Sequence, residues 1–96
     1  SYVEESVAKA LKTMVFEPNN ARTWVNIKAM ITGFLVKQWE TGALMGASMR
    51  DAFFVEVGTQ TTTQSKIDAG IINIRIGMAL ARPGEFIIIE FNHKTV

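Results

Sequence analysis

The segment from Phe86 to Phe91 constrains the fold of this chain more than any other part of the sequence. It reads Phe-Ile-Ile-Ile-Glu-Phe, a composition typical of a β-strand because it is almost entirely β-branched or aromatic. Side chains of a strand alternate between two faces. One face therefore carries Phe86, Ile88 and Glu90, and the other carries Ile87, Ile89 and Phe91. Since both faces are mostly apolar, we expect this strand to be covered on both sides.

Two arrangements would provide that cover, and the pattern alone does not separate them. The segment is either the central strand of an ordinary closed domain or a sheet edge that strands from other chains complete. Edge strands are usually protected by a charge or a proline, and residues 86–89 contain neither. An unprotected edge of this kind would aggregate, which favours pairing with neighbouring chains by β-augmentation.

Two earlier strands are predicted from the alternation of side chains along the sequence. The more regular one covers residues 72–80, and its apolar face consists of Ile72, Ile74, Ile76, Met78 and Leu80. Its opposite face carries Asn73, Arg75, Gly77 and Ala79, as expected for a sheet with one solvated face. The other strand spans residues 52–57. A polar loop over residues 58–64 and one helical turn over residues 65–68 are predicted to join the two.

Two helices are predicted before the strands. Apolar residues recur at helical spacing from Ser1 to Val15, and Pro18 interrupts the pattern because it lacks an amide donor. A longer helix is predicted from Ala21 to Thr41, where Gly42 ends it. Its apolar stripe contains Trp24, Ile27, Ile31, Phe34, Leu35 and Trp39. A second apolar row, formed by Val25, Ala29 and Val36, predicts that this helix is buried on more than one side.

Two helices followed by three strands predict an α+β fold, with the helices on one face of a small, mainly antiparallel sheet. The 96 residues are the length of a single domain. The 10 basic and 9 acidic residues are balanced and scattered, unlike the clustered positive charge of nucleic-acid-binding proteins. No apolar run approaches the length of a membrane span.

The sequence contains no recognisable catalytic or metal-binding set of residues. Cysteine is absent, and the only histidine, His93, follows the predicted last strand. Glu85 and Glu90 are five residues apart and point to opposite sides of that strand, so they do not form an acid–base pair. We therefore predict no catalytic residue, no metal and no cofactor, and we expect a binding or structural role.

Several short motifs occur in the order found in one known family. They are Phe16-Glu17-Pro18-Asn19, Trp24, Phe34-Leu35, Trp39, Gly42-Ala43-Leu44, Gly46, Ala52-Phe53-x-Val55, Ile67-Asp68-x-Gly70 and Arg82-Pro83-x-Glu85-Phe86. As an ordered set that runs through nearly the whole chain, they resemble the C-terminal domain of contractile tail sheath proteins of phages, tailocins and extracellular injection systems. Gly84 departs from the pattern, since the family usually has alanine there.

The resemblance implies a structural subunit. Sheath subunits assemble in the bacterial cytoplasm as rings around an inner tube, and they contract to drive that tube through a target envelope. The finished sheath is part of a virion tail or of a released injection particle. The usual N-terminal region is missing from residues 1–96, so we expect them to be a single domain from a larger chain.

The resemblance also implies where this domain meets its partners. Arms from neighbouring subunits would complete its sheet, with strand pairing along Phe86, Ile87, Ile88, Ile89, Glu90, Phe91, Asn92 and His93. Arg22, Lys28 and Lys37 are the cations expected to contact the tube, and residues 92–96 are expected to begin a donated arm. Two other functions remain open. They are a baseplate or adaptor module with the same α+β layout, and an enzyme fragment whose catalytic residues lie elsewhere.

Overall fold

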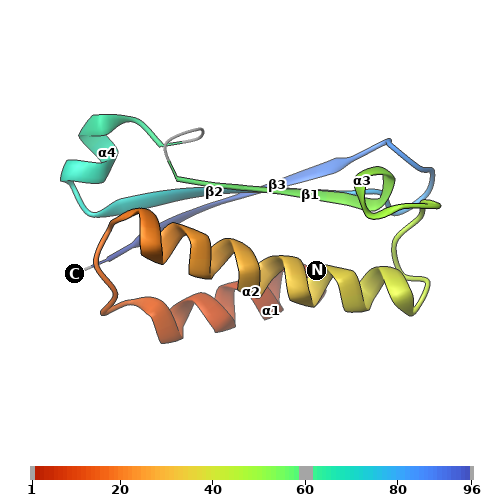
Figure 1. The fold of residues 1–96 in the computed structure, drawn as a ribbon, viewed down its shortest axis with the longest axis horizontal. Coiled ribbons are helices and arrows are strands. Elements are labelled where there is room, and N and C mark those ends of the chain that lie inside the picture. Colours follow the sequence, from red (N-terminus) through yellow and green to blue (C-terminus); the bar gives the residue numbers. More distant parts are fainter. Residues whose placement is uncertain (1, 59–61, 96) are drawn as a thin grey trace.

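The protein, described by a computed structural model over residues 2–58 and 62–95, has two layers (Figure 1). Helices α1 and α2 cover one face of a three-stranded antiparallel sheet, which is the predicted α+β architecture. The elements in chain order are α1 (Tyr2–Leu11), the 3-10 helix η1 (Lys12–Met14), α2 (Ala21–Glu40), α3 (Met49–Ala52), β1 (Phe53–Val57), α4 (Gln64–Asp68), β2 (Ile71–Met78) and β3 (Ile87–Lys94). Parts of the predicted first helix, polar loop and arm fall on Ser1, residues 59–61 and Val96, which lie outside the described residues.

Helix α2 is the longest element, and both of its ends follow from local chemistry. Asn20 precedes it with extended backbone, and its side-chain oxygen accepts a hydrogen bond from the Thr23 amide at 3.1 Å. This bond satisfies one of the amides that have no partner at a helix start. The helix ends at Glu40, and Gly42 then takes a left-handed backbone (φ 87°) that other residues rarely adopt. The predicted range of 21–41 is confirmed to within one residue.

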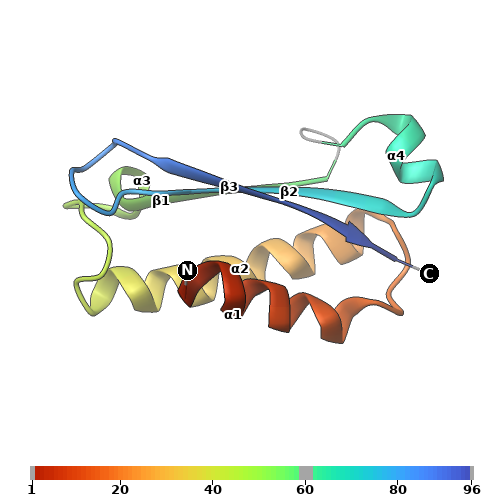
Figure 2. The ribbon, with the colours of Figure 1, turned by 180° about the vertical axis from the view of Figure 1, so that it is seen from behind.

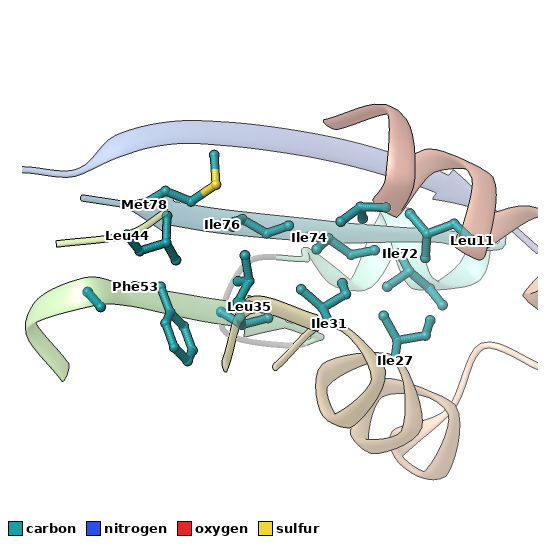
Figure 3. Packing of buried hydrophobic residues seen from close by; sticks show 13 residues of the cluster. Leu11, Ile27, Ile31, Leu35, Leu44, Phe53, Ile72, Ile74, Ile76 and Met78 are labelled. Atoms are coloured by element: carbon teal, nitrogen blue, oxygen red, sulfur yellow. The ribbon is translucent and has the colours of Figure 1, made fainter. Parts of the chain in front are cut away.

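The hydrophobic core fills the space between α2, α1 and the sheet (Figure 3). Ile27, Ile31 and Leu35 of α2 recur every four residues and are buried against the sheet. The buried cluster consists of Val7, Leu11, Ile27, Ile31, Leu35, Leu44, Ala52, Phe53, Val55, Ile72, Ile74, Ile76 and Met78. Removing such apolar surface from water contributes about 25 cal/mol per Å², which makes this layer contact the main source of stability.

The strand order is β1-β2-β3, so β2 is central and β3 lies at an edge of the sheet. Both pairings are antiparallel, and Ile76 of β2 lies opposite Val55 of β1 and Ile89 of β3. In this chain, therefore, β3 is not the central strand of a closed sheet. Figure 2 shows α1 lying below the later part of β3, while α2 runs below β1 and β2.

Three details of the predicted elements are wrong. In the second row of α2, Val36 packs against the core, but Val25 is 66% exposed and Ala29 is exposed, because the sheet and α1 cover other sides of the helix. Leu80 lies beyond the end of β2 and is exposed instead of joining the apolar row. Helix α3 was not predicted, since four residues are too few to display a helical period.

Strand β3 is longer than predicted. It runs to Lys94, so Asn92 and His93 pair with β2 and do not begin a donated arm. Thr95 extends this pairing, because its amide donates to the Gly70 carbonyl at 2.7 Å and its hydroxyl donates to the same oxygen at 2.9 Å. The arm expected over residues 92–96 had rested on the resemblance alone. At a sheet edge, however, polar side chains reach water without leaving the strand.

Candidate functional site

Strand β3 exposes apolar side chains on both of its faces. Ile87 is 52% exposed and Ile88 is 41% exposed, although consecutive residues of a strand point in opposite directions. On the neighbouring strand β2, Ile74 and Ile76 are fully buried. The predicted assignment of β3 residues to two faces is confirmed, since Glu90 lies beside Arg75 on the outer face. The edge of the sheet therefore carries apolar surface that residues 2–58 and 62–95 leave uncovered.

The outer face of the sheet is less solvated than predicted, because other parts of the chain lie on it. Gly77 faces outward from β2, and a Cβ there would overlap the ring of Phe54. That ring meets Phe86 edge to face, with centroids 5.2 Å apart. Asn73 is only 7% exposed, and its backbone amide donates to the Thr62 hydroxyl at 2.8 Å. The part of the outer face near β3 remains open between these two covered ends.

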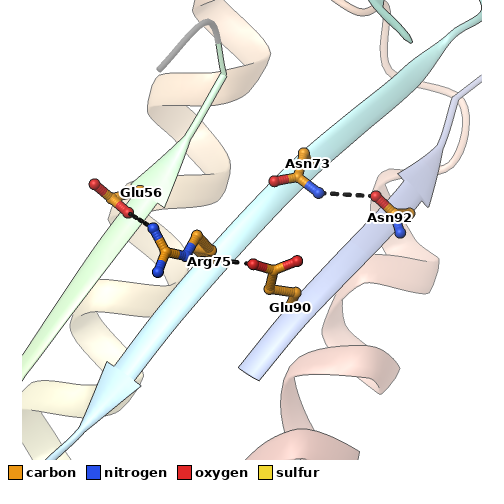
Figure 4. A network of polar contacts seen from close by, with 5 residues as sticks. All are labelled: Glu56, Asn73, Arg75, Glu90 and Asn92. Atoms are coloured by element: carbon orange, nitrogen blue, oxygen red, sulfur yellow. Dashed lines mark hydrogen bonds and ion pairs between the residues drawn. The ribbon is translucent and has the colours of Figure 1, made fainter. Parts of the chain in front are cut away.

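Polar contacts cross all three strands on that open part of the outer face (Figure 4). Arg75 of β2 forms ion pairs with Glu56 of β1 and Glu90 of β3, each with an N–O distance of 3.4 Å. Beside them, the Asn73 side-chain amide donates to the Asn92 side-chain oxygen at 2.8 Å. Exposed ion pairs contribute only about 0.2–1 kcal/mol each. Their main effect is to favour the observed register over one shifted by a residue, which would send each partner to the opposite face.

The free edge of β3 presents the backbone groups of every second residue. In an antiparallel sheet, residues that exchange hydrogen bonds with one neighbour alternate with residues whose amide and carbonyl point away from it. The Thr95 amide donates to Gly70, its opposite residue, so the odd-numbered residues of β3 bond to β2. The backbone groups that point to the free edge are those of Ile88, Glu90, Asn92 and Lys94.

A groove of about 450 Å³ lies between α1 and the end of β3. The apolar residues that line it are Ala8, Leu11, Val15 and Phe91. His93 also lines the groove, and its Nε2 atom is shielded from solvent and has no hydrogen-bond partner among the described residues. The groove is therefore continuous with the free edge of β3 and extends its apolar surface onto the flank of α1.

A second cluster joins two motif residues, Asn19 and Trp24. The Asn19 side-chain amide donates to the carbonyls of Ile67 and Ile71, each at 3.2 Å, and its oxygen accepts from Trp24 Nε1 at 2.7 Å. The Trp24 ring lies on Gly58, where a Cβ would be 2.7 Å from Cε3. Asn19 thereby fixes the start of α2 to the segment before β2. The sequence did not reveal this role, because the contacts are 48 and 52 positions apart.

The residues predicted to contact partners fall in two places. Ile87 to His93 lie in β3, and Phe86 directly precedes it, so they form one continuous edge. Arg22, Lys28 and Lys37 are exposed on α2. At 3.6 residues per turn, Lys28 and Lys37 project about 180° apart, whereas Arg22 and Lys37 are about 60° apart. One flat partner surface would therefore contact Arg22 and Lys37 but not Lys28, and both sets remain predictions.

The described residues offer backbone groups and apolar surface rather than a cluster of reactive side chains. Within residues 2–58 and 62–95, no group of three or more His, Asp or Glu side chains could hold a metal ion. No helix in that part of the chain has the length and hydropathy needed to cross a membrane. The arrangement is suited to strand pairing.

These features define a structural assembly domain, and comparison with known proteins identifies its kind. The chain belongs to the phage tail sheath C-terminal domain family, whose sequence model matches residues 1–94. It is a structural domain of the type found in sheath subunits of contractile particles. A comparison with curated proteins found no match.

Solved structures of contractile particles contain similar chains. A chain of the anti-feeding prophage (AFP) baseplate is 44% identical, with a TM-score of 0.80 over 94% of this chain and 25% of that one. A chain of the PVC sheath complex in the contracted state is 42% identical, with a TM-score of 0.79 over 93% of this chain and 25% of that one. A chain of the AFP baseplate in its contracted state is 34% identical, with a TM-score of 0.78 over 94% of this chain and 24% of that one. This chain therefore spans about a quarter of the length of the chains that it matches.

Proposed function

We propose that the subunit containing this domain polymerises into a sheath around an inner tube and contracts to drive that tube through a target envelope. The family supports this proposal, as does the likeness to a sheath complex described in its contracted state. Assembly in the bacterial cytoplasm belongs to the same proposal. Residues 1–96 would act within it as a single domain of a larger subunit.

The domain would connect neighbouring subunits through the free edge of β3. A strand from another subunit would bond to the free backbone groups of Ile88, Glu90, Asn92 and Lys94. It would also cover apolar side chains on both faces of the sheet. The single observation that carries this proposal is the exposure of Ile87 and Ile88 on opposite faces of an edge strand.

Strand pairing has the physical properties that a contracting lattice needs. Each backbone hydrogen bond contributes about 0.5–1.5 kcal/mol net, and apolar burial adds about 25 cal/mol per Å². One such joint is weak, but repeated and linked contacts act at high effective concentration. Subunits joined in this way would rotate as rigid bodies while remaining connected.

Aspartate substitutions in the full-length subunit test this proposal. Ile88→Asp or Ile89→Asp is expected to abolish sheath assembly, seen by electron microscopy as the loss of tubes or cylinders, because a carboxylate would be buried under the added strand. Leu80→Asp is the matched control for Ile88→Asp, since Leu80 is 44% exposed and Ile88 is 41% exposed but Leu80 lies outside β3. Ile89 is partly buried against the core, so circular dichroism first checks that its variant folds. Normal polymerisation of both β3 variants would rule out pairing at this edge.

Contact with the tube would involve the side of α2 that carries Arg22 and Lys37. Replacing both residues by glutamate is expected to weaken co-purification with the tube protein, whereas Lys28→Glu is the matched control on the opposite side of the helix. Equal effects from the pair and from the control would argue against this side as the tube contact.

A second candidate function is a role as a baseplate component or adaptor. Two of the similar structures are described as baseplates, which is the observation that favours it. Gold labelling of a tag on this domain distinguishes the two in electron micrographs. A sheath subunit would be labelled along the whole particle, and a baseplate component only at one end.

A further inference from the structure

The groove between α1 and β3 lies where the added strand of the proposed joint would pass. Neighbouring strands of a sheet are about 4.8 Å apart, so a strand paired to β3 would lie over the flank of α1 beyond Phe91. Ala8, Lys12 and Val15 form one row along that flank, and all three line the groove. The added strand would therefore place every second side chain against this row.

The shape and charge of the groove restrict those side chains. Its floor is apolar, and the small side chain of Ala8 leaves room there. Lys12 and Lys94 line the groove and are exposed, and neither forms an ion pair with another described residue. No carboxylate is among the described residues that line it.

We propose that this groove recognises an extended peptide strand from a neighbouring subunit whose groove-facing positions alternate a branched apolar residue with an aspartate or glutamate. The apolar side chain fills the space over Ala8 and Phe91. The carboxylate lies beside Lys12, on the side of the groove where His93 lies. The Nε2 atom of His93 lacks a partner, and a buried polar nitrogen without a hydrogen bond is uncommon in folded proteins.

This assignment rests on the proposed function, because it states what the incoming strand carries. It adds a basis for choosing one strand over another. Backbone hydrogen bonds along Ile88 to Lys94 would accept any extended chain, whereas Lys12 would favour an acidic one. Charge complementarity of this kind favours the correct partner and also speeds encounter.

Two matched synthetic peptides test the proposal on this chain. One is Val-Thr-Glu-Thr-Val-Thr-Glu-Thr, and the other replaces both glutamates by lysine. Titration of the isotope-labelled chain by NMR is expected to show the glutamate peptide binding about fivefold more tightly, which corresponds to the upper value for one exposed ion pair. Hydrogen exchange should slow at the amides of Ile88, Glu90, Asn92 and Lys94.

Variants of the chain show which residues cause the preference for the glutamate peptide. Lys12→Glu should reverse the preference for the glutamate peptide, and this side chain is exposed, so the fold is expected to persist. Lys9→Glu combined with Lys28→Glu, at exposed positions that do not line the groove, is the control and should leave it unchanged. Ala8→Phe should weaken both peptides by filling the groove.

Equal affinity for the two peptides, or binding that the groove variants leave unchanged, would overturn the proposal. So would the absence of binding by either peptide. These outcomes differ from those that would contradict the proposed function. That proposal fails if the Ile88→Asp and Ile89→Asp subunits still assemble into a normal sheath. A sheath that needs the β3 edge but shows no charge preference would retain the joint and lose only the assigned strand chemistry.

Discussion

Strands β2 and β3 are adjacent, equally long and similarly rich in isoleucine, yet their environments differ. Ile72, Ile74 and Ile76 of β2 are completely buried, whereas β3 begins with Ile87 and Ile88 at 52% and 41% exposure. The difference lies in position, since β2 has a strand on each side and β3 has one. The isoleucines of β2 build the core. Those at the start of β3 contribute less to the fold than their number suggests, which leaves them available for another chain.

The largest expected effect separates these two roles directly. Ile74→Asp should prevent folding, because it removes a fully buried side chain and places a carboxylate in the core. Truncation of such a residue alone costs about 2–5 kcal/mol, and small domains have only about 5–15 kcal/mol in total. Ile88→Asp should leave the fold intact and prevent assembly. Circular dichroism on heating measures the first outcome, and light scattering measures association of the chain through its edge.

The proposed difference between β2 and β3 would be contradicted if Ile88→Asp unfolded the chain as completely as Ile74→Asp. In that case β3 would be as necessary to the core as β2. Association that persisted in folded Ile88→Asp would instead show that self-association uses another surface. Leu80→Asp again provides the control for an aspartate at a similarly exposed position.

Proline substitutions distinguish the two edges of β3 itself. Ile89→Pro removes an amide that bonds to β2 and truncates a partly buried side chain, so it should cost about 3 kcal/mol or more. Glu90→Pro removes an amide that points to the free edge, a position where proline is tolerated. It should therefore fold nearly as well as its control Glu90→Ala but lose assembly. Urea denaturation measures the first difference, and equal destabilisation by both prolines would contradict the alternation assigned to β3.

Elements with one buried face were predictable from the sequence. Helix α2 and strand β2 repeat apolar residues with the period of their own geometry because the core lies on one side of each. The second apolar row of α2 was misjudged for a related reason. Val25 and Ala29 follow the helical period, but the period does not reveal whether a neighbour covers that side, and in this chain none does among the described residues.

The candidate site was predictable in composition but not in geometry. The pattern of residues 86–91 showed that both faces need cover, and it did not show that β3 would lie at an edge. The resemblance placed Asn92 and His93 in the pairing edge, but the residue pattern ended the strand at Phe91 and did not include Lys94, because polar residues at an edge carry no strand period. The groove beside Phe91 depends on α1, which is more than 70 positions away in the chain, so no local pattern could reveal it.

A smaller effect tests how closely the Phe54 ring of β1 packs on the outer face of β2. Gly77→Ala would place a methyl group against the Phe54 ring, so it should destabilise the fold by about 1–3 kcal/mol. Gly33→Ala is the matched control, since its Cβ would meet no atom within 4 Å and alanine favours a helix by about 1 kcal/mol. Thermal denaturation should shift in opposite directions for the two. A neutral Gly77→Ala would show that the ring of Phe54 moves away freely.

The smallest expected effect concerns the ion pairs that link β2 to each neighbour. Arg75 is 41% exposed, and its partners Glu56 and Glu90 are 38% and 55% exposed, so Glu56→Gln and Glu90→Gln should each cost about 0.2–1 kcal/mol. Both effects should shrink in 1 M salt, where charges are screened beyond about 3 Å. If β3 were held mainly by this contact and not by backbone pairing, Glu90→Gln would cost much more than Glu56→Gln. Nearly equal losses in urea denaturation are expected instead, because an edge strand with a complete set of bonds to β2 needs little from one exposed carboxylate.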